Sequence, residues 1–191
     1  TTLSYMGHAY FAWGQLEKAV DAYQEAIKIF KKSGSKTELV RVLTSMGVMH
    51  SKLGNYNKAI ENFQQGILFL EEIGNESLTA HTYSLIGSVY RRIGKYDKAT
   101  NYIEKALGIF LKKNDTQGIA NIYTQLSTML LIDGRYQEGI QNLNQALEIY
   151  NERDSKLQVG EVLANIGLAY YLDKNYKKSI SYLNQAIDIL E

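Results

Sequence analysis

The segment Gly54-Asn-Tyr-Asn-Lys-Ala59 decides the fold, because closely related segments return along the chain at intervals of forty residues. The other copies are Gly14-Gln-Leu-Glu-Lys-Ala19, Gly94-Lys-Tyr-Asp-Lys-Ala99, Gly134-Arg-Tyr-Gln-Glu-Gly139 and Lys174-Asn-Tyr-Lys-Lys-Ser179. A second set of small residues keeps the same interval: Gly7, Gly47, Gly87, Ser127 and Gly167. Five copies at a constant interval indicate tandem repeats. We expect one domain over residues 1–191, with repeats at about 1–34, 35–74, 75–114, 115–154 and 155–191.

Each repeat is predicted to contain two helices of about eighteen residues, or roughly 27 Å each. An apolar stripe of helical period begins after each of four preferred N-cap residues: Ser35, Asn75, Asp115 and Ser155. The residue before each cap tolerates left-handed backbone, and these residues are Gly34, Gly74, Asn114 and Asp154. Ser35 with Glu38, and Ser155 with Gln158, also have the spacing of a capping box. These residues provide the turns in a chain that has no proline.

Both helices of a repeat carry an apolar face. Leu43, Met46 and His50 follow the spacing of a buried stripe in a first helix. Phe63 and Ile67 do the same in a second helix. Glycine and alanine within these stripes allow neighbouring helix axes to approach closely. A single helix pair cannot bury both faces, so we expect an all-α fold in which five helix-turn-helix repeats stack as an α-solenoid.

The composition excludes several classes of function. The 191 residues contain 21 Lys and Arg against 20 Asp and Glu, which argues against a basic protein that binds nucleic acid or a membrane surface. Because there is no cysteine, the chain has no disulfide framework, thiolate metal site or cysteine nucleophile. It has no apolar run of about 18 residues and no signal-peptide pattern, so we expect a soluble, cytoplasmic protein.

No group of residues indicates catalysis, a metal or a cofactor. His8, His50 and His81 lack metal-binding spacing. His50 occupies the position at which tyrosines pack in other repeats, which favours a buried structural histidine. The glycines fall at turns and packing sites rather than in a phosphate-binding loop. The 15 tyrosines recur at packing positions, so a nucleic-acid platform is the weaker interpretation.

The order Leu3, Gly7, Tyr10, Gly14, Ala19, Tyr23, Ala26 resembles the signature of the tetratricopeptide repeat (TPR). The resemblance covers all five repeats, but the period is forty rather than 34 residues and the usual terminal proline is missing. This longer repeat is similar to those of Pins/LGN-type adaptors, kinesin light chains and bacterial Rap-type and MalT-like regulators. The resemblance implies a right-handed superhelix whose first helices line a concave groove. It also implies a binding scaffold rather than an enzyme.

The groove positions carried over from this resemblance are Arg41, Thr44, Lys52, His81, Ser84, Ser88, Arg91, Arg92, Asn121, Thr124, Thr128 and Tyr171. Cations gather among the central ones, which favours a carboxylate-bearing partner. Towards the C-terminus the lining becomes apolar through Leu131, Ile132, Leu168, Tyr171 and Leu172. We therefore expect an acidic, amphipathic protein or peptide segment as the partner. In the alternative interpretation, Arg91 and Arg92 are only solvated charges at a helix C-terminus.

The two ends of the chain leave open what covers the last repeat and what else the protein contains. Ile180, Leu183 and Ile187 are expected to be half exposed, since no polar helix covers the last repeat. Either further repeats or another domain cover this face, or two copies associate end to end. The chain begins with Thr1, so we expect a fragment of a larger protein. The alternative function is a sensory or regulatory module that controls an attached effector domain.

Overall fold

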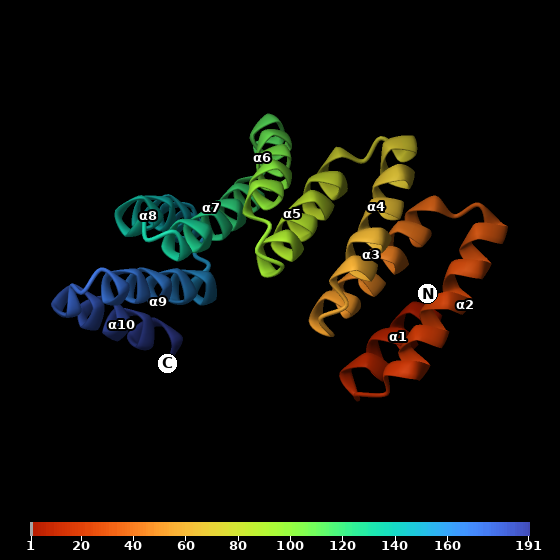
Figure 1. Cartoon of the computed structure of the whole chain (residues 1–191), viewed down its shortest axis with the longest axis horizontal. Helices are drawn as coiled ribbons and strands as arrows, with labels where there is room; N and C mark the ends of the chain where they lie inside the picture. Colours follow the sequence, from red (N-terminus) through yellow and green to blue (C-terminus); the bar gives the residue numbers. More distant parts are fainter. Residues whose placement is uncertain (1) are drawn as a thin grey trace. The chain divides into compact units, whose positions relative to one another are not determined.

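The computed structural model describes residues 2–191, and this part of the chain forms ten α-helices without a strand (Figure 1). The first helices of the repeats are α1 (Thr2–Ala12), α3 (Lys36–Lys52), α5 (Glu76–Arg92), α7 (Thr116–Ile132) and α9 (Lys156–Leu172). The second helices are α2 (Leu16–Ser33), α4 (Tyr56–Ile73), α6 (Tyr96–Lys113), α8 (Tyr136–Glu152) and α10 (Tyr176–Leu190). The predicted all-α solenoid of five helix-turn-helix repeats is therefore confirmed.

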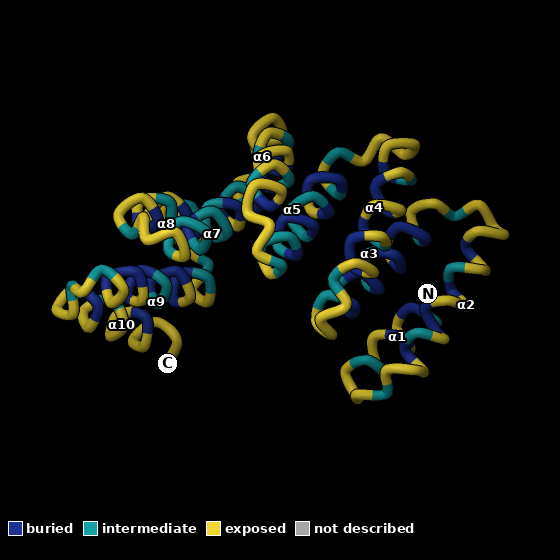
Figure 2. The backbone as a smooth tube through the Cα atoms, in the orientation of Figure 1, coloured by how far each residue is buried: buried dark blue, intermediate teal, exposed yellow. Residues whose placement is uncertain are grey.

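The chain divides into two compact units. Unit 1 covers Thr1–Tyr102 and unit 2 covers Ile103–Glu191, so the boundary falls within α6. In each unit the buried residues lie where paired helices face one another, while the outer sides of the helices are exposed (Figure 2). Each unit therefore has its own apolar core.

The turns between repeats have the expected backbone conformation. Residues in the left-handed region end α2, α4, α6 and α8: Gly34 (φ 71°), Gly74 (φ 73°), Asn114 (φ 53°) and Asp154 (φ 51°). The Asn75 side chain accepts a hydrogen bond from the Leu78 amide, and the Asp115 side chain accepts one from the Gly118 amide, both at 3.0 Å. These bonds satisfy amides that have no partner within the helix.

The capping-box expectation was wrong at both of its sites. Neither Ser35 nor Ser155 makes a side-chain cap bond. The Ser35 hydroxyl instead accepts a hydrogen bond from Ser33 at 2.9 Å. Glu38 forms an ion pair with Arg41 one turn further on.

Lys174 is the residue that adopts the left-handed conformation in the turn of the last repeat, with φ at 60°. Glycine occupies the equivalent positions, with φ between 76° and 80° at Gly54, Gly94 and Gly134. A left-handed non-glycine residue costs about 1–2 kcal/mol, part of which glycine loses again through its flexible unfolded state. We expect Lys174→Gly to raise the free energy of unfolding by up to about 1 kcal/mol, measured by urea denaturation. Lys174→Ala keeps the strained conformation, so an equal gain in that control would contradict the explanation.

The repeats pack by placing an aromatic or aliphatic residue against a glycine. In unit 1, a Cβ atom added to Gly47 would lie 2.5 Å from the Phe63 ring. In unit 2, a Cβ atom on Gly167 would lie 2.8 Å from Leu183. These glycines therefore allow the two helices of a repeat to approach closely, as the sequence predicted.

Candidate functional site

Consecutive first helices contact one another within each unit. In unit 1, α3 contacts both α1 and α5, and in unit 2, α7 contacts α9. We call the side of unit 1 formed by α1, α3 and α5 the first-helix face. Eight predicted groove residues belong to its helices: Arg41, Thr44 and Lys52 on α3, and His81, Ser84, Ser88, Arg91 and Arg92 on α5. The other four belong to unit 2: Asn121, Thr124 and Thr128 on α7, and Tyr171 on α9.

The two cations of α3 have different surroundings. Arg41 is exposed and forms an ion pair with Glu38 of the same helix. The Lys52 ammonium lies 5.8 Å from the centre of the Phe11 ring, which belongs to α1. A cation above an aromatic face is attracted to the ring electrons, so Lys52 links α3 to α1 while its charge stays at the surface.

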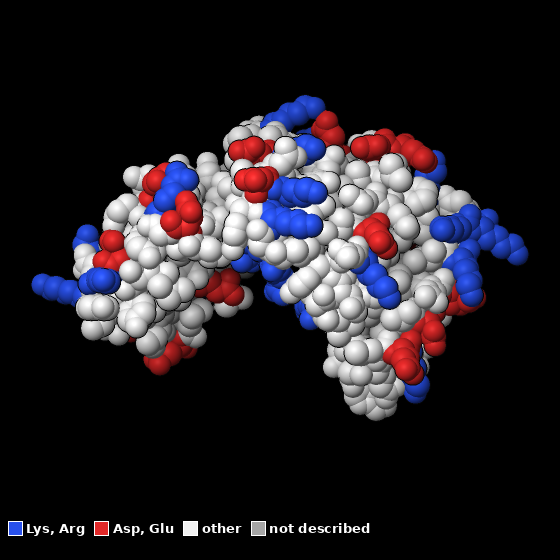
Figure 3. Space-filling view, in the orientation of Figure 1, with Lys and Arg blue, Asp and Glu red and all other residues white. Residues whose placement is uncertain are grey.

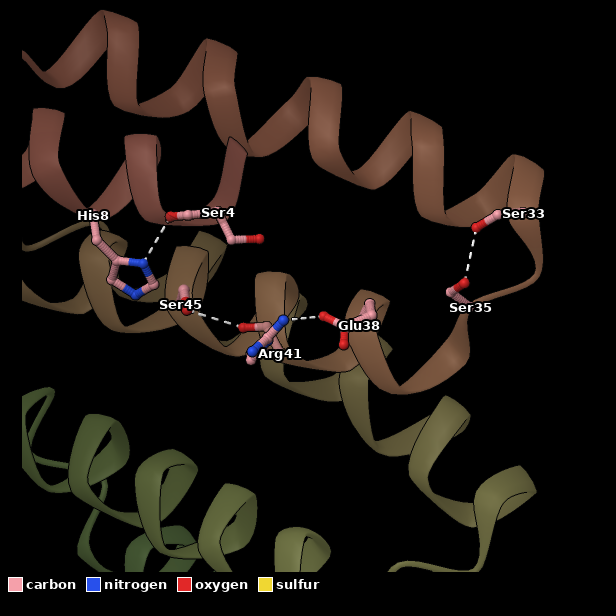
Figure 4. A network of polar contacts seen from close by, with 7 residues as sticks. All are labelled: Ser4, His8, Ser33, Ser35, Glu38, Arg41 and Ser45. Atoms are coloured by element: carbon pink, nitrogen blue, oxygen red, sulfur yellow. Dashed lines mark hydrogen bonds and ion pairs between the residues drawn. The ribbon is translucent and has the colours of Figure 1, made fainter. Parts of the chain in front are cut away.

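Figure 4 shows polar side chains of α1 and α3 together with Arg41. Nδ1 of His8 lies 2.8 Å from the backbone carbonyl oxygen of Ser4. The Ser45 hydroxyl donates to the Arg41 carbonyl at 2.9 Å. Each bond stays within one helix and spans one turn, so these side chains add a polar surface without joining the two helices.

Arg91 and Arg92 form the last turn of α5. Within residues 2–191, the structure gives neither guanidinium an ion-pair partner. Arg91 is half-buried, and its Nε atom is buried without a hydrogen-bond acceptor, whereas Arg92 is exposed. A buried donor that lacks an acceptor costs about 1–3 kcal/mol. An incoming carboxylate could pair with the exposed guanidinium of Arg92.

Thr44 lies against the second helix of its own repeat. Its hydroxyl oxygen is 4.0 Å from the position that a Cβ atom on Gly66 of α4 would occupy. The same oxygen is buried without a hydrogen-bond partner. Of the predicted residues on α3, Arg41 and Lys52 are therefore the exposed ones.

In unit 2, the predicted polar residues are engaged by the protein itself. The Asn121 side-chain oxygen accepts a hydrogen bond of 2.7 Å from the Tyr150 hydroxyl. The Thr124 and Thr128 hydroxyls donate to carbonyl oxygens one turn earlier in α7, at 3.1 and 3.0 Å. Tyr171 is exposed, and its ring centre lies 5.8 Å from that of Tyr176. The threonine hydroxyls are left able to accept, but not donate, a further hydrogen bond.

The apolar lining expected in unit 2 is divided between surface and core. Leu131 packs against the core of the unit, and its side chain lies 2.9 Å from the position that a Cβ atom on Gly139 would occupy. The other members of this group are exposed, namely Ile132, Leu168, Tyr171 and Leu172. Exposed apolar side chains on consecutive first helices are suited to contact an apolar partner.

Three surface depressions of about 200–260 Å³ lie at the turns between helices. One is lined by residues that include Lys95 and Lys98, a second by Arg135 and Asp173, and the third by Ser155. None of the three includes a predicted groove residue. They are open and shallow, unlike the concave, largely apolar pockets that enclose small molecules.

Three repeats contain a contact between a lysine and a tyrosine that we did not predict from the sequence. Lys18 lies over Tyr10, Lys98 over Tyr90 and Lys178 over Tyr170, at 5.7, 5.6 and 5.0 Å from the ring centres. The lysine follows the tyrosine by eight residues each time. This constant spacing could have been used to predict the contact from the sequence. The pairs join the first helix of a repeat to the start of the second, so they contribute to packing.

His50 is buried in α3, as the sequence predicted, and its Nδ1 atom has no hydrogen-bond partner. Burial lowers the pKa of His50, the positive charge of Lys58 lowers it further, and the negative charge of Glu61 opposes both effects. The unfolded chain therefore binds the proton more readily than the folded one. His50 has a pKa of 6.5 in the unfolded chain and a lower one in the folded chain. The stability of the folded chain is therefore highest above pH 6.5, where His50 is neutral in both states, and it decreases as the pH falls below this value.

This histidine makes a test of stability against pH possible. We expect the free energy of unfolding to fall between pH 7.5 and 5.5 (about one unit either side of the unfolded pKa), because the unfolded chain takes up a proton at His50. His50→Tyr introduces the residue type found at Tyr90 and Tyr170 and should remove part of this fall. Urea denaturation at several pH values measures it, with His81→Tyr, at an exposed position, as the control. Identical pH profiles for the wild type and His50→Tyr would contradict the assignment.

The described residues contain no group of three or more His, Cys, Asp or Glu side chains suited to hold a metal ion. Within the same part of the chain, no helix combines the length and apolar character needed to cross a membrane. Positive and negative side chains are interspersed on the face of the molecule shown in Figure 3. The basic residues of the first-helix face are thus a local feature of a chain with a formal net charge of +1.

Helix pairs that repeat every forty residues, with consecutive first helices in contact within each unit, define a TPR-type α-solenoid. The family model of the MalT-like TPR region matches residues 1–189, and the chain belongs to this family. Comparison with curated proteins returned no match.

Solved structures share the fold at low sequence identity. BtubC (BKLC) from P. vanneervenii superposes with a TM-score of 0.83 at 18% identity, covering 98% of this chain and 78% of BtubC. The apo form of RapI superposes with a TM-score of 0.82 at 16% identity, covering 98% of this chain and 52% of RapI. A Rap protein complexed with Competence and Sporulation Factor superposes with a TM-score of 0.74 at 12% identity, and the match covers 98% of this chain and 62% of the Rap protein. The chain thus spans between half and two thirds of the two Rap proteins.

Proposed function

We propose that this chain is a protein-interaction module whose first-helix face in unit 1 binds an acidic segment of a protein partner. The observation that carries the proposal is the pair Arg91 and Arg92, two adjacent cations without an ion-pair partner among the described residues. Lys52 adds positive charge on the neighbouring helix α3, whereas the charge of Arg41 is paired with that of Glu38. A carboxylate-bearing segment would pair with these cations.

Several observations support a protein or peptide as the partner. The chain belongs to the MalT-like TPR family, and one solved structure of the same fold is a Rap protein complexed with a named factor. No described group of side chains suggests metal-dependent chemistry. A binding role, rather than catalysis, accounts for these features together.

Selection from a random peptide library displayed on phage tests this proposal. We expect the selected peptides to be enriched in Asp and Glu, which would pair with the cations of the first-helix face. Their affinity, measured by fluorescence anisotropy, should fall when the salt concentration rises from about 50 to about 500 mM, because exposed ion pairs are screened. Selected peptides that are neutral or basic, with affinities insensitive to salt, would overturn the proposal.

A sensory or regulatory module is the second candidate, and the match to the MalT-like family favours it. In this case peptide binding would control an effector domain attached to the repeats. The full-length gene distinguishes the two candidates. A kinase, cyclase or DNA-binding domain in the same protein favours regulation, whereas repeats alone favour an adaptor.

A further inference from the structure

The turns inside the repeats of unit 1 carry an excess of positive charge. Residues 11–18, 51–58 and 91–98 contain these turns, and the acidic residues among them are Glu17 and Asp97. The cations of the same ranges are Lys18, Lys52, Lys58, Arg91, Arg92, Lys95 and Lys98. All but Arg91 are exposed, and among the described residues none of them has an ion-pair partner. We call the three turns with these cations the basic edge.

The three turns lie along the same edge of unit 1 (Figure 1). The first and second turns meet where the Lys52 ammonium lies 5.8 Å from the centre of the Phe11 ring. A depression of about 250 Å³ joins the second turn to the third, and its lining includes Asn57 and Lys95. The basic edge is therefore continuous across three repeats.

The opposite edge of unit 1, formed by the turns between repeats, has balanced charges. Residues 31–38 and 71–78 contain cations and acidic residues in similar number, namely Lys31, Lys32 and Lys36 against Glu38, Glu71, Glu72 and Glu76. Lys36 and Glu72 form an ion pair at 2.7 Å between the two turns. The excess of positive charge is thus a property of the basic edge and not of both edges of unit 1.

The spacing of the three turns suits an extended segment. The first helices contact one another, α3 with both α1 and α5, and the axes of packed helices lie about 8–10 Å apart. A segment in the polyproline II conformation has about three residues per turn and rises about 3.1 Å per residue. Every third side chain of such a segment therefore points to the same side, at intervals of about 9 Å. Acidic residues at this interval can each meet one turn of the basic edge.

The acidic residues of the basic edge favour a partner whose charges are spaced. Glu17 and Asp97 each precede a lysine of the edge, and Glu61 lines the depression between the second and third turns. The closely spaced phosphates of a nucleic acid, or an anionic membrane surface, would be placed against these carboxylates as well as against the cations. A protein segment can instead place uncharged residues beside them.

We infer that the acidic segment of the partner lies along the basic edge in the polyproline II conformation, with Asp or Glu at every third position. This inference rests on the proposed function, because it takes an acidic protein segment as the partner. It adds Lys58, Lys95 and Lys98 to the residues that bind the segment, and it specifies the spacing of the acidic residues.

Two labelled peptides of identical composition, with blocked ends, test the spacing. The spaced peptide is Asp-Ala-Pro-Asp-Ala-Pro-Asp, and the alternating peptide is Asp-Ala-Asp-Pro-Asp-Ala-Pro. Both carry the same charge, but in the alternating peptide successive carboxylates point to different sides and cover a shorter distance. Fluorescence anisotropy at low ionic strength should show that the spaced peptide binds about fivefold more tightly, which is the contribution of one exposed ion pair. Equal affinities, or tighter binding of the alternating peptide, would overturn the inference.

The double variant Lys58→Glu/Lys95→Glu tests the location of the segment. Both lysines lie at the start of a helix, α4 or α6, where a glutamate suits the helix dipole, so the variant is expected to keep its fold, as circular dichroism would check. Binding of the spaced peptide should weaken about tenfold, because two attractive pairs become repulsive. Lys31→Glu/Lys32→Glu is the control on the opposite edge, with the same change of net charge and an expected loss below about threefold.

The remaining outcomes separate this inference from the proposed function. If Arg91→Glu/Arg92→Glu weakens peptide binding and Lys58→Glu/Lys95→Glu does not, the inference fails and the proposed function stands. If neither these peptides nor any selected from the library is acidic and bound, both fail. Tighter binding of a single-stranded oligothymidine, or of phosphatidylserine vesicles, than of the spaced peptide would overturn the inference by showing that the basic edge prefers a polyanion or a membrane.

Discussion

Gly47→Ala is expected to lower the free energy of unfolding by about 1–3 kcal/mol, although alanine is the better helix former. The new Cβ atom would lie 2.5–2.9 Å from three atoms of the Phe63 ring, well inside van der Waals contact. Phe63 is 1% exposed and belongs to a core cluster of unit 1, so its ring cannot turn away freely. Helix propensity alone would stabilise the variant by about 1 kcal/mol. The sign of the change therefore shows whether packing or propensity dominates, and urea denaturation measures it.

Gly66→Ala is the matched control for this variant. It makes the same change in α4, which packs against α3, but the nearest atom to the added Cβ is 4.0 Å away. Alanine occupies the equivalent position in the other repeats, for example at Ala26 and Ala106. We expect Gly66→Ala to leave stability unchanged or raise it by up to about 1 kcal/mol. If both variants gained stability, close packing at Gly47 would be refuted.

A double variant tests the same contact by making the residue that faces position 47 smaller. In the fourth repeat, serine replaces the glycine, and the facing residue is the smaller Leu143. We expect Phe63→Leu to recover part of the stability lost in Gly47→Ser, with a coupling energy of about 1 kcal/mol or more. Strictly additive losses would mean that residues 47 and 63 do not compete for the same space.

Reversing the charge of Arg91 and Arg92 is expected to weaken binding of an acidic peptide by roughly 100-fold, equal to about 2.7 kcal/mol. The double variant Arg91→Glu/Arg92→Glu removes two cations and places two like charges opposite the carboxylates of the ligand. Arg91 is half-buried, so its contact is screened by salt less than a fully exposed pair. The peptides obtained by selection are the probes, and fluorescence anisotropy measures their affinity.

The control reverses two adjacent cations in the last turn of another helix of unit 1, α2. Lys31 and Lys32 are exposed in the last turn of α2, so Lys31→Glu/Lys32→Glu changes the net charge of unit 1 by the same amount. We expect less than about a threefold loss of affinity in this control, because distant exposed charges are screened. Equal losses in both variants would show that binding responds to net charge rather than to the first-helix face.

The repeats and their turns could be predicted because they depend on local residue types. The forty-residue interval, the residues before each N-cap and the glycines inside each repeat were enough to place all the helices. His50 was predicted to be buried from the tyrosines at equivalent positions, and the structure confirms this. Such features need no knowledge of which distant side chains meet.

The contacts of individual polar residues could not be predicted in this way. The bond between Asn121 and Tyr150 joins two helices, and nothing in the spacing of these residues signals it. The capping box expected at Ser35 does not form, and Glu38 pairs with Arg41 instead. Sequence spacing identifies which partners are within reach, but the relative strength of competing bonds decides which of them form.

Site-specific photo-crosslinking tests most directly the central claim, which is that a partner segment binds on the first-helix face of unit 1. A photoreactive amino acid at Ser51, beside Lys52 on α3, is compared with one at Gln65, an exposed residue of α4. Incubated with a selected acidic peptide, the chain should crosslink to it from position 51 and not from position 65. Crosslinking from position 65 alone, or equally from both positions, would contradict the account.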